Sequence, residues 1–408
     1  MRAQGLIRRT IAWTLLMVIL PAAISLTAMA DSDIVVVTNE YRAVFADRLR
    51  FTLAIESATP IVEATLRYRR GEGPLITRVP VPITPGQHVV AEYVRPLDRG
   101  EIPPGTTMTY HWTLVDQEGT KHHTEPVAFV YEDDRFDWRM ISSPEITLLW
   151  YEDEEQARSL FDDAMAALRR LEDEIGVHME QPVRIYAYQK SADMRAALFA
   201  HSEGYDARVL TMGVVVSDDT LLLLASHRDA HLTIAHELSH VVVGFATDNP
   251  YSDLPRWLDE GLAMYAQGEL QEANQRALAR SIRDDTLISV RSLSGYTGIP
   301  EEVDLYYGEV HSLVEYLIRT HGKEKMTELL ATCREGIRQE DALTRVFGFG
   351  LDQLDSDWRA SLGLGPRGEA QPSSDPRPSP EKSPAACSLI PLLSLMGLAG
   401  ALPHGPRP

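Results

Sequence analysis

Hydrophobic and polar residues alternate with a period of two across residues 34–131. The clearest runs are Ala64, Leu66 and Tyr68, and then Met108, Tyr110, Trp112 and Leu114. Successive side chains of a strand point to opposite faces of a sheet, so this pattern predicts half-buried strands. Turn residues such as Pro103-Pro104-Gly105 separate the runs. We expect an all-β, immunoglobulin-like or fibronectin-like sandwich over residues 31–140.

After Trp150 the apolar spacing changes to that of helices. One helical face carries Phe161, Met165, Leu168, Leu171 and Ile175. Gly176 is placed to end that helix. Apolar runs at 183–188, 214–216 and 221–224 predict strands, residues 191–200 a helix, and a further helix begins near Asp229. The sequence therefore predicts a second, α+β domain over residues 145–364, largely helical in its later part.

The first thirty residues have the composition of a secretory signal peptide. Arg2, Arg8 and Arg9 precede an apolar run that ends in the small-x-small site Ala28-Met29-Ala30. The run is nearly long enough to remain as an uncleaved membrane anchor. On both readings the rest of the chain is exported, so we expect an extracellular or cell-surface protein.

The C-terminal residues change character twice. Residues 365–384 are rich in Pro, Ser, Gly and charge, which predicts a disordered linker. Residues 385–408 are mostly apolar, although Pro391 and the short length make a marginal span. This tail is either a membrane anchor or sorting tail, or a disordered apolar end.

Charge and cysteine content narrow the partners. The chain has 39 Lys and Arg against 59 Asp and Glu, a formal net charge of -20, which repels nucleic acid and anionic membrane surfaces. The two cysteines, Cys333 and Cys387, cannot form a disulfide framework for the folded domains because the second lies in the tail.

The strongest chemical signal is His236-Glu237-Leu238-Ser239-His240, which lies in an apolar and therefore buried helix. The spacing of i and i+4 places both imidazoles on one face, where they can hold one Zn²⁺ ion. Glu237 then lies beside the metal, where a carboxylate can take a proton from a bound water. Burying three such polar groups in a helix costs free energy unless a partner binds them.

Catalytic zinc takes a third protein ligand. Glu260 is the best candidate, because Pro255 can open a new helix and Gly261 would permit its close approach to the first helix. Asp253 and Asp259 are the competing acids, and we expect both to face solvent.

HELSH followed by WLDEG, with Glu260 twenty positions after His240, resembles the gluzincin pattern. It is similar in particular to the peptidase MA-like proteins related to the M1 family, over roughly residues 145–360. The separation is slightly longer than is usual in M1. The resemblance implies a thermolysin-like zincin fold, one zinc ion and peptide-bond hydrolysis, with His236, His240 and Glu260 as ligands and Glu237 as base.

In these families a tyrosine on a later helix often stabilises the oxyanion. The resemblance assigns this role to Tyr307, with Tyr306 next and His311, one turn away, as a further donor. For any of them, packing in the core is the competing role.

One feature departs from the M1 pattern. M1 aminopeptidases carry a GxMEN strand whose glutamate binds the substrate amine, whereas the comparable stretch here, residues 210–215, contains no acid. This favours an endopeptidase, with the strand pairing along an extended peptide substrate. The alternative is a non-catalytic, zinc-containing cell-surface binding protein, against which the intact Glu237 argues.

Overall fold

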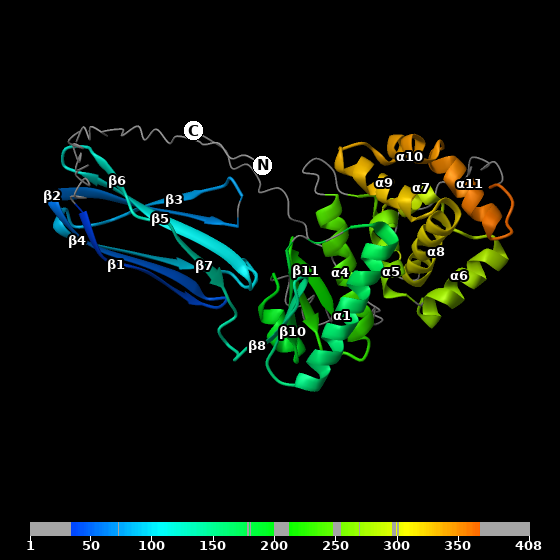
Figure 1. Ribbon diagram of the computed structural model, residues 1–408, viewed down its shortest axis with the longest axis horizontal. Coiled ribbons are helices and arrows are strands. Elements are labelled where there is room, and N and C mark those ends of the chain that lie inside the picture. The colour runs from blue at the N-terminus through cyan, green and yellow to red at the C-terminus, as the bar shows by residue number, and fades with distance from the viewer. Residues whose placement is uncertain are drawn as a thin grey trace, which may run out of the picture.

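The computed structural model describes residues 34–367, apart from 72, 178, 180, 200–211, 248–253, 269, 296–298, 300 and 301. A β-rich N-terminal region lies beside a C-terminal region that is first mixed and then helical (Figure 1). The predicted multidomain order of a β-rich and a largely helical part is confirmed. The predicted signal peptide at 1–30 and the predicted apolar tail at 385–408 lie outside the described residues. Within 34–367, the described helices include none with the length and apolar character of a membrane span.

The N-terminal region is built from antiparallel strands around one long, bent strand. They are β1 (Ile34–Val44), β2 (Arg48–Arg70), β3 (Thr77–Val81), β4 (Gly86–Pro96), β5 (Thr106–Asp116), β6 (Lys121–His123) and β7 (Val127–Tyr131). The first half of β2 pairs with β1 and β4, and its second half pairs with β3 and β5. Phe51 and Tyr68, at opposite ends of β2, stack at 5.8 Å, so the strand folds back into two facing layers.

The alternation in the sequence decides which side chains enter this core. Ala64, Leu66 and Tyr68 are buried, and so are the alternating apolar residues of β5. Gly105 has a positive φ of 82° at the predicted turn. The immunoglobulin-like or fibronectin-like connectivity stays a prediction.

A second sheet opens the C-terminal region, in the order β11-β12-β10-β9-β8. Its strands are β8 (Arg139–Ser142), β9 (Ile146–Trp150), β10 (Val183–Tyr188), β11 (Gly213–Ser217) and β12 (Thr220–Leu224). β9, β10 and β12 are parallel, and β8 and β11 are antiparallel edge strands. The sheet thus begins at Arg139, earlier than residue 145, which is the predicted start of the second domain.

Helices cover this sheet and continue beyond it. They are α1 (Glu154–Ile175), α2 (Ser191–Ala196), α4 (Ala230–Ala246), α5 (Arg256–Gln267), α6 (Glu272–Asp284), α7 (Val290–Leu293), α8 (Val303–His321), α9 (Lys323–Arg334), α10 (Gln339–Phe347) and α11 (Leu351–Ser361). α1 ends at Gly176 with φ 67°, as expected. The thermolysin-like topology stays a prediction.

Gly261 does not serve the contact that we predicted from the sequence. A Cβ atom there would lie 2.5 Å from Val314 Cγ2 and 2.7 Å from the carbonyl oxygen of Val310, both on α8. The glycine therefore lets α5 approach α8 rather than α4.

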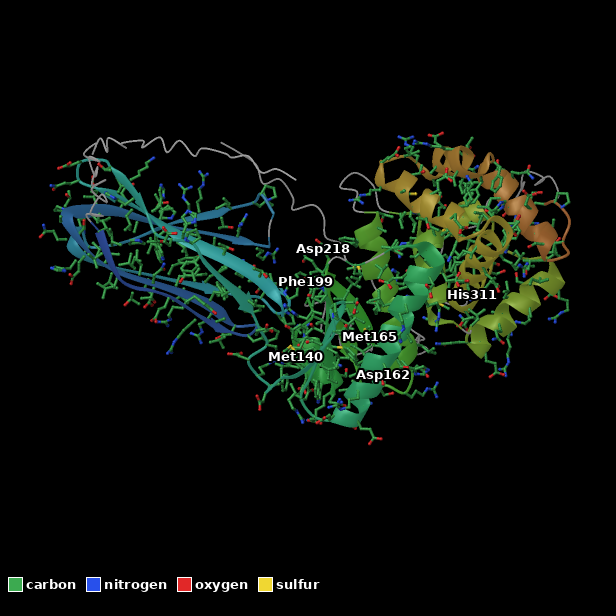
Figure 2. All side chains as sticks on the ribbon, viewed as in Figure 1. Met140, Asp162, Met165, Phe199, Asp218 and His311 are labelled. Atoms are coloured by element: carbon green, nitrogen blue, oxygen red, sulfur yellow. The ribbon has the colours of Figure 1, made fainter. Side chains whose placement is uncertain are left out.

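The helices pack on one face of β10 and β12, and the N-terminal region packs on the opposite face. Ile185 and Leu223 pack against the helices, whereas Tyr188 and Leu224 point into the core of the N-terminal region. Asp133 is fully buried between the regions and accepts a hydrogen bond of 2.8 Å from the Tyr188 hydroxyl. Phe199, labelled in Figure 2, lies at the same junction. A buried polar contact inside an apolar seam fixes the two regions against each other.

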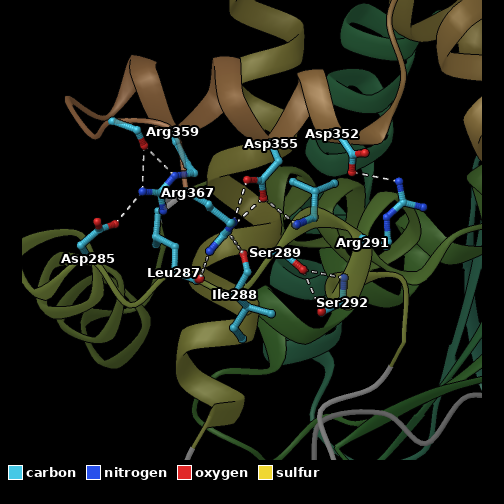
Figure 3. A network of polar contacts seen from close by, with 12 residues as sticks. Asp285, Leu287, Ile288, Ser289, Arg291, Ser292, Asp352, Asp355, Arg359 and Arg367 are labelled. Carbon is cyan, nitrogen blue, oxygen red and sulfur yellow. Dashed lines mark hydrogen bonds and ion pairs between the residues drawn. The ribbon is translucent and has the colours of Figure 1, made fainter. Parts of the chain in front are cut away.

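The helical region extends three residues past the predicted domain end at residue 364. Figure 3 shows Arg367 in contact with Asp355 and with the carbonyls of Leu287 and Ile288. The carbonyl oxygen of Gly365 accepts hydrogen bonds of 3.0 and 2.9 Å from Arg359. Residues 365–367 therefore belong to the folded region, and the rest of the predicted linker lies outside the described residues.

Candidate active site

Two histidines on α4 and one glutamate on α5 come together in the interior. His236 and His240 lie one turn apart with ring centroids separated by 4.9 Å. Nε2 of His236 is 3.5 Å, and Nε2 of His240 is 3.9 Å, from Oε2 of Glu260. One ligand atom from each residue lies within 4.8 Å of the others. α4 can hold these polar groups inside because Leu238 and its other apolar residues pack on every side.

These three atoms point at one another without hydrogen-bond partners. Among the described residues, Nε2 of His236, Nε2 of His240 and Oε2 of Glu260 are all buried and accept or donate no hydrogen bond. Burying such groups costs free energy unless something binds them. Two imidazole nitrogens and a carboxylate oxygen are a suitable donor set for a divalent metal ion that keeps one open position. The predicted ligands therefore fit a metal.

Asp259 was expected to face solvent or to compete for the metal. The structure instead places it against His240, one of the predicted ligands. Its Oδ1 lies 3.0 Å from Nδ1 of His240, which leaves Nε2 directed at the centre. Burial lowers the pKa of His240, but the carboxylates of Asp259 and then Glu260 outweigh burial and raise that pKa to about 10. Asp253, the other competing acid, lies outside the described residues.

Glu237 occupies the position expected of a base. Its side chain is buried, and its carboxylate is close enough to His240 to contribute to that raised pKa. Gly213, at the start of edge strand β11, lies against its Cγ methylene and its carboxyl carbon. β11 thus runs along the same side of α4 as the carboxylate, with one edge free of strands of the described sheet.

Of the three candidate oxyanion donors, the structure brings Tyr307 to the site. Its ring is buried, with its centroid 6.4 Å from that of His236. Tyr306 instead points toward α7, where its hydroxyl donates to the carbonyl of Leu293 at 3.4 Å. His311, labelled in Figure 2, lies one turn further along α8 and forms a hydrogen bond with the backbone of Gly268.

Sequence reasoning did not find Gln267. Its amide lies 2.8 Å from Nδ1 of His236. It stands seven residues after Glu260, two helical turns away on the same face of α5. That spacing is the signal that could have revealed it.

Residues 163–363 match the family model of the Peptidase MA superfamily. This chain carries a Peptidase MA domain. The matched range contains His236, Glu237, His240, Glu260 and Tyr307. The family match and the buried His-His-Glu group together support a metallopeptidase that acts on peptides.

Similar solved structures include two of an M1 zinc metallopeptidase from Deinococcus radiodurans. One is 13% identical, covers 83% of this chain and 93% of its own, and has a TM-score of 0.34. A mutant bound to a Tyr-Ser-Ala substrate is 13% identical, covers 81% and 93%, and has the same TM-score of 0.34. The Br derivative of BhCBM56 is 13% identical and covers 24% of this chain and 92% of its own, with a TM-score of 0.18. No curated protein matches this sequence.

Proposed function

We propose that this chain is an exported, zinc-dependent endopeptidase. The observation that carries the proposal is the convergence of three buried ligand atoms, from His236, His240 and Glu260, next to the carboxylate of Glu237. A metal that served structure alone would need no neighbouring base. Export is supported by the leader-like sequence at residues 1–30, and the apolar tail at 385–408 is proposed as an attachment to the membrane.

His236, His240 and Glu260 would hold the ion, which when bound supplies a Lewis acid for the scissile carbonyl and for the attacking water. Glu237 accepts the proton of that water and returns it to the leaving amine. The hydroxyl of Tyr307 donates a hydrogen bond to the oxyanion. Burial of these side chains strengthens each interaction, because the surroundings have a lower dielectric than water.

The free edge of β11 is proposed to bind the substrate backbone. An edge strand presents unpaired N–H and C=O groups with which an extended peptide can pair. Residues 210–215 hold no acid that would bind a free amino terminus. Both features favour cleavage within a chain over removal of its first residue.

The test combines zinc content with hydrolysis of casein and of a library of quenched peptides, on the full chain and on Glu237→Gln. We expect one zinc per chain in both proteins and a loss of roughly 10²–10⁴ in kcat in the variant. Equal cleavage of amino-blocked and free peptides would support an endopeptidase. Zinc without cleavage across the library would favour the binding-protein alternative, and no zinc after metal loading would contradict the site.

A further inference from the structure

α5 supplies more than a ligand to the metal centre. Glu260 provides the third donor atom, and its neighbour Asp259 contacts Nδ1 of His240. Gln267, at the last turn of the same helix, contacts Nδ1 of His236 at 2.8 Å. Each of the two proposed ligand histidines, His236 and His240, is therefore contacted at Nδ1 by one side chain of α5. The two partners differ in charge, because Asp259 is an acid and Gln267 is a neutral amide.

The orientation of the Gln267 amide determines whether His236 can bind a metal. The structure places the amide nitrogen of Gln267 2.8 Å from Nδ1. In that orientation the ring must carry its proton on Nε2, which blocks that atom as a ligand. With the side-chain oxygen toward Nδ1, Nδ1 carries the proton and Nε2 is open. The Oε1 atom of Gln267 is buried and has no hydrogen-bond partner among the described residues. It is thus available to accept the Nδ1 proton.

The end of α5 that carries Gln267 is fixed from two sides. Arg170 of α1 donates a hydrogen bond to the carbonyl of Ala266, the residue before Gln267. His311 of α8 forms a hydrogen bond with the backbone of Gly268, the residue after it. Gly268 has φ 91° and lies so close to Arg170 that a Cβ atom would be 3.1 Å from its Nη1. A side chain between two anchored backbone units has little freedom to leave the imidazole.

We propose that Gln267 is a positioning residue for the metal centre, whose side-chain oxygen holds His236 in the tautomer that directs Nε2 at the ion. This inference rests on the metal site of the proposed function. A partner behind a ligating histidine fixes both the orientation of the ring and its proton. Gln267 itself does not touch the metal or the substrate.

The test is the zinc Kd, measured by competition with a chromophoric chelator on the full chain. Gln267→Leu keeps most of the volume but accepts no hydrogen bond, so we expect the Kd to rise by about 10–100-fold. Gln267→Glu keeps the acceptor and should restore wild-type binding or tighten it. Thermal unfolding of the zinc-free proteins reports whether each variant folds. If Gln267→Leu does not fold, Gln267→Asn replaces it, because its amide is too short to reach the ring.

Gln339→Leu is the matched control. Gln339 also contacts α5, since its Oε1 accepts 3.1 Å hydrogen bonds from Trp257 and Ser294, but it touches neither histidine. Its loss should leave the zinc Kd unchanged. Equal Kd values for the wild type and Gln267→Leu, or equal weakening by the Leu and Glu variants, would overturn the inference. A wild type that binds no zinc would instead refute the proposed function on which it rests.

Discussion

A Cβ atom on Gly213 would lie 2.7 Å from Cγ of Glu237. The same atom would lie 2.5 Å from Cγ2 of Thr233, one turn earlier on α4. Heavy atoms cannot approach so closely, so the strand can pass the base only because residue 213 has no side chain. Contact between β11 and α4 therefore sets both the path of the edge strand and the position of the proposed base.

Gly213→Ala is expected to reduce kcat/KM by at least about 10-fold, because the methyl group must displace Glu237 or β11. Zinc binding should persist, since none of the three ligands touches residue 213. Peptide hydrolysis and zinc content on the same sample measure the two effects. Gly244→Ala is the control, because a Cβ atom at Gly244 of α4 meets nothing within 4 Å. Unchanged hydrolysis in Gly213→Ala would show that the contact is not needed for catalysis.

Tyr307→Phe is expected to reduce kcat by about 10²-fold with little change in KM, because the hydroxyl serves the oxyanion only in the transition state. The comparison is Tyr306→Phe, which removes a hydroxyl on the neighbouring residue that bonds Leu293 instead. Steady-state kinetics at saturating zinc separate the two. A larger loss in Tyr306→Phe would reverse the assignment.

Part of what the sequence predicted of the site and the fold is fixed by local spacing. An i to i+4 pair on a buried helix brings His236 and His240 together, whatever surrounds them. Period-two alternation likewise predicts which faces of β2 and β5 are buried. Strand 183–188 coincides with β10, and the helix expected near Asp229 begins at Ala230.

The parts that the sequence could not predict depend on how the elements are rotated and packed against one another. Tyr306 and Tyr307 point about 100° apart around α8, and local spacing does not tell which one faces His236. The family resemblance ranked Tyr307 first, and the packed helix places that ring beside His236. Asp259 was expected in solvent, because nothing local shows that α5 presses it against His240. Gly261 faces α8 for the same reason, since composition alone does not name its neighbour.

Glu309 predicts a pH dependence of stability that does not involve the metal. Burial raises the pKa of Glu309 to about 8, although the backbone N–H of Ile288 and the charge of Arg367 act in the opposite direction. The unfolded chain ionises this carboxyl near its ordinary value of 4.5, whereas the folded chain keeps the proton until about pH 8. The free energy that Glu309 contributes to folding is therefore fully present below pH 4.5 and is lost as the pH rises to about 8.

The variant Glu309→Gln should remove this dependence, because the amide keeps an acceptor for Ile288 but does not ionise. Between pH 5 and pH 8, the free energy of unfolding should fall by about 2–4 kcal/mol more in the wild type than in the variant. Urea unfolding at both pH values gives the difference. Parallel pH profiles of the two proteins would contradict the raised pKa.

The contacts of Arg367 predict that this residue stabilises the helical region. Its Nε and Nη2 bond the two oxygens of Asp355 at 2.8 and 2.9 Å, and its guanidinium also bonds the carbonyls of Leu287 and Ile288. Removing the guanidinium leaves Asp355, with only 12% of its side chain exposed, without its cation. We expect Arg367→Ala to lower the free energy of unfolding by about 1–3 kcal/mol.

Arg291→Ala is the matched control for Arg367→Ala, because Arg291 pairs with Asp352, whose side chain is 88% exposed. An exposed pair of this kind contributes at most about 0–1 kcal/mol. Chains that stop after residue 364 and after residue 367 extend the comparison. Urea unfolding should show that the shorter chain loses at least as much stability as Arg367→Ala, because it also removes the Gly365 carbonyl that Arg359 binds. Equal stability of the two truncated chains would mean that these contacts do not hold the helical region together.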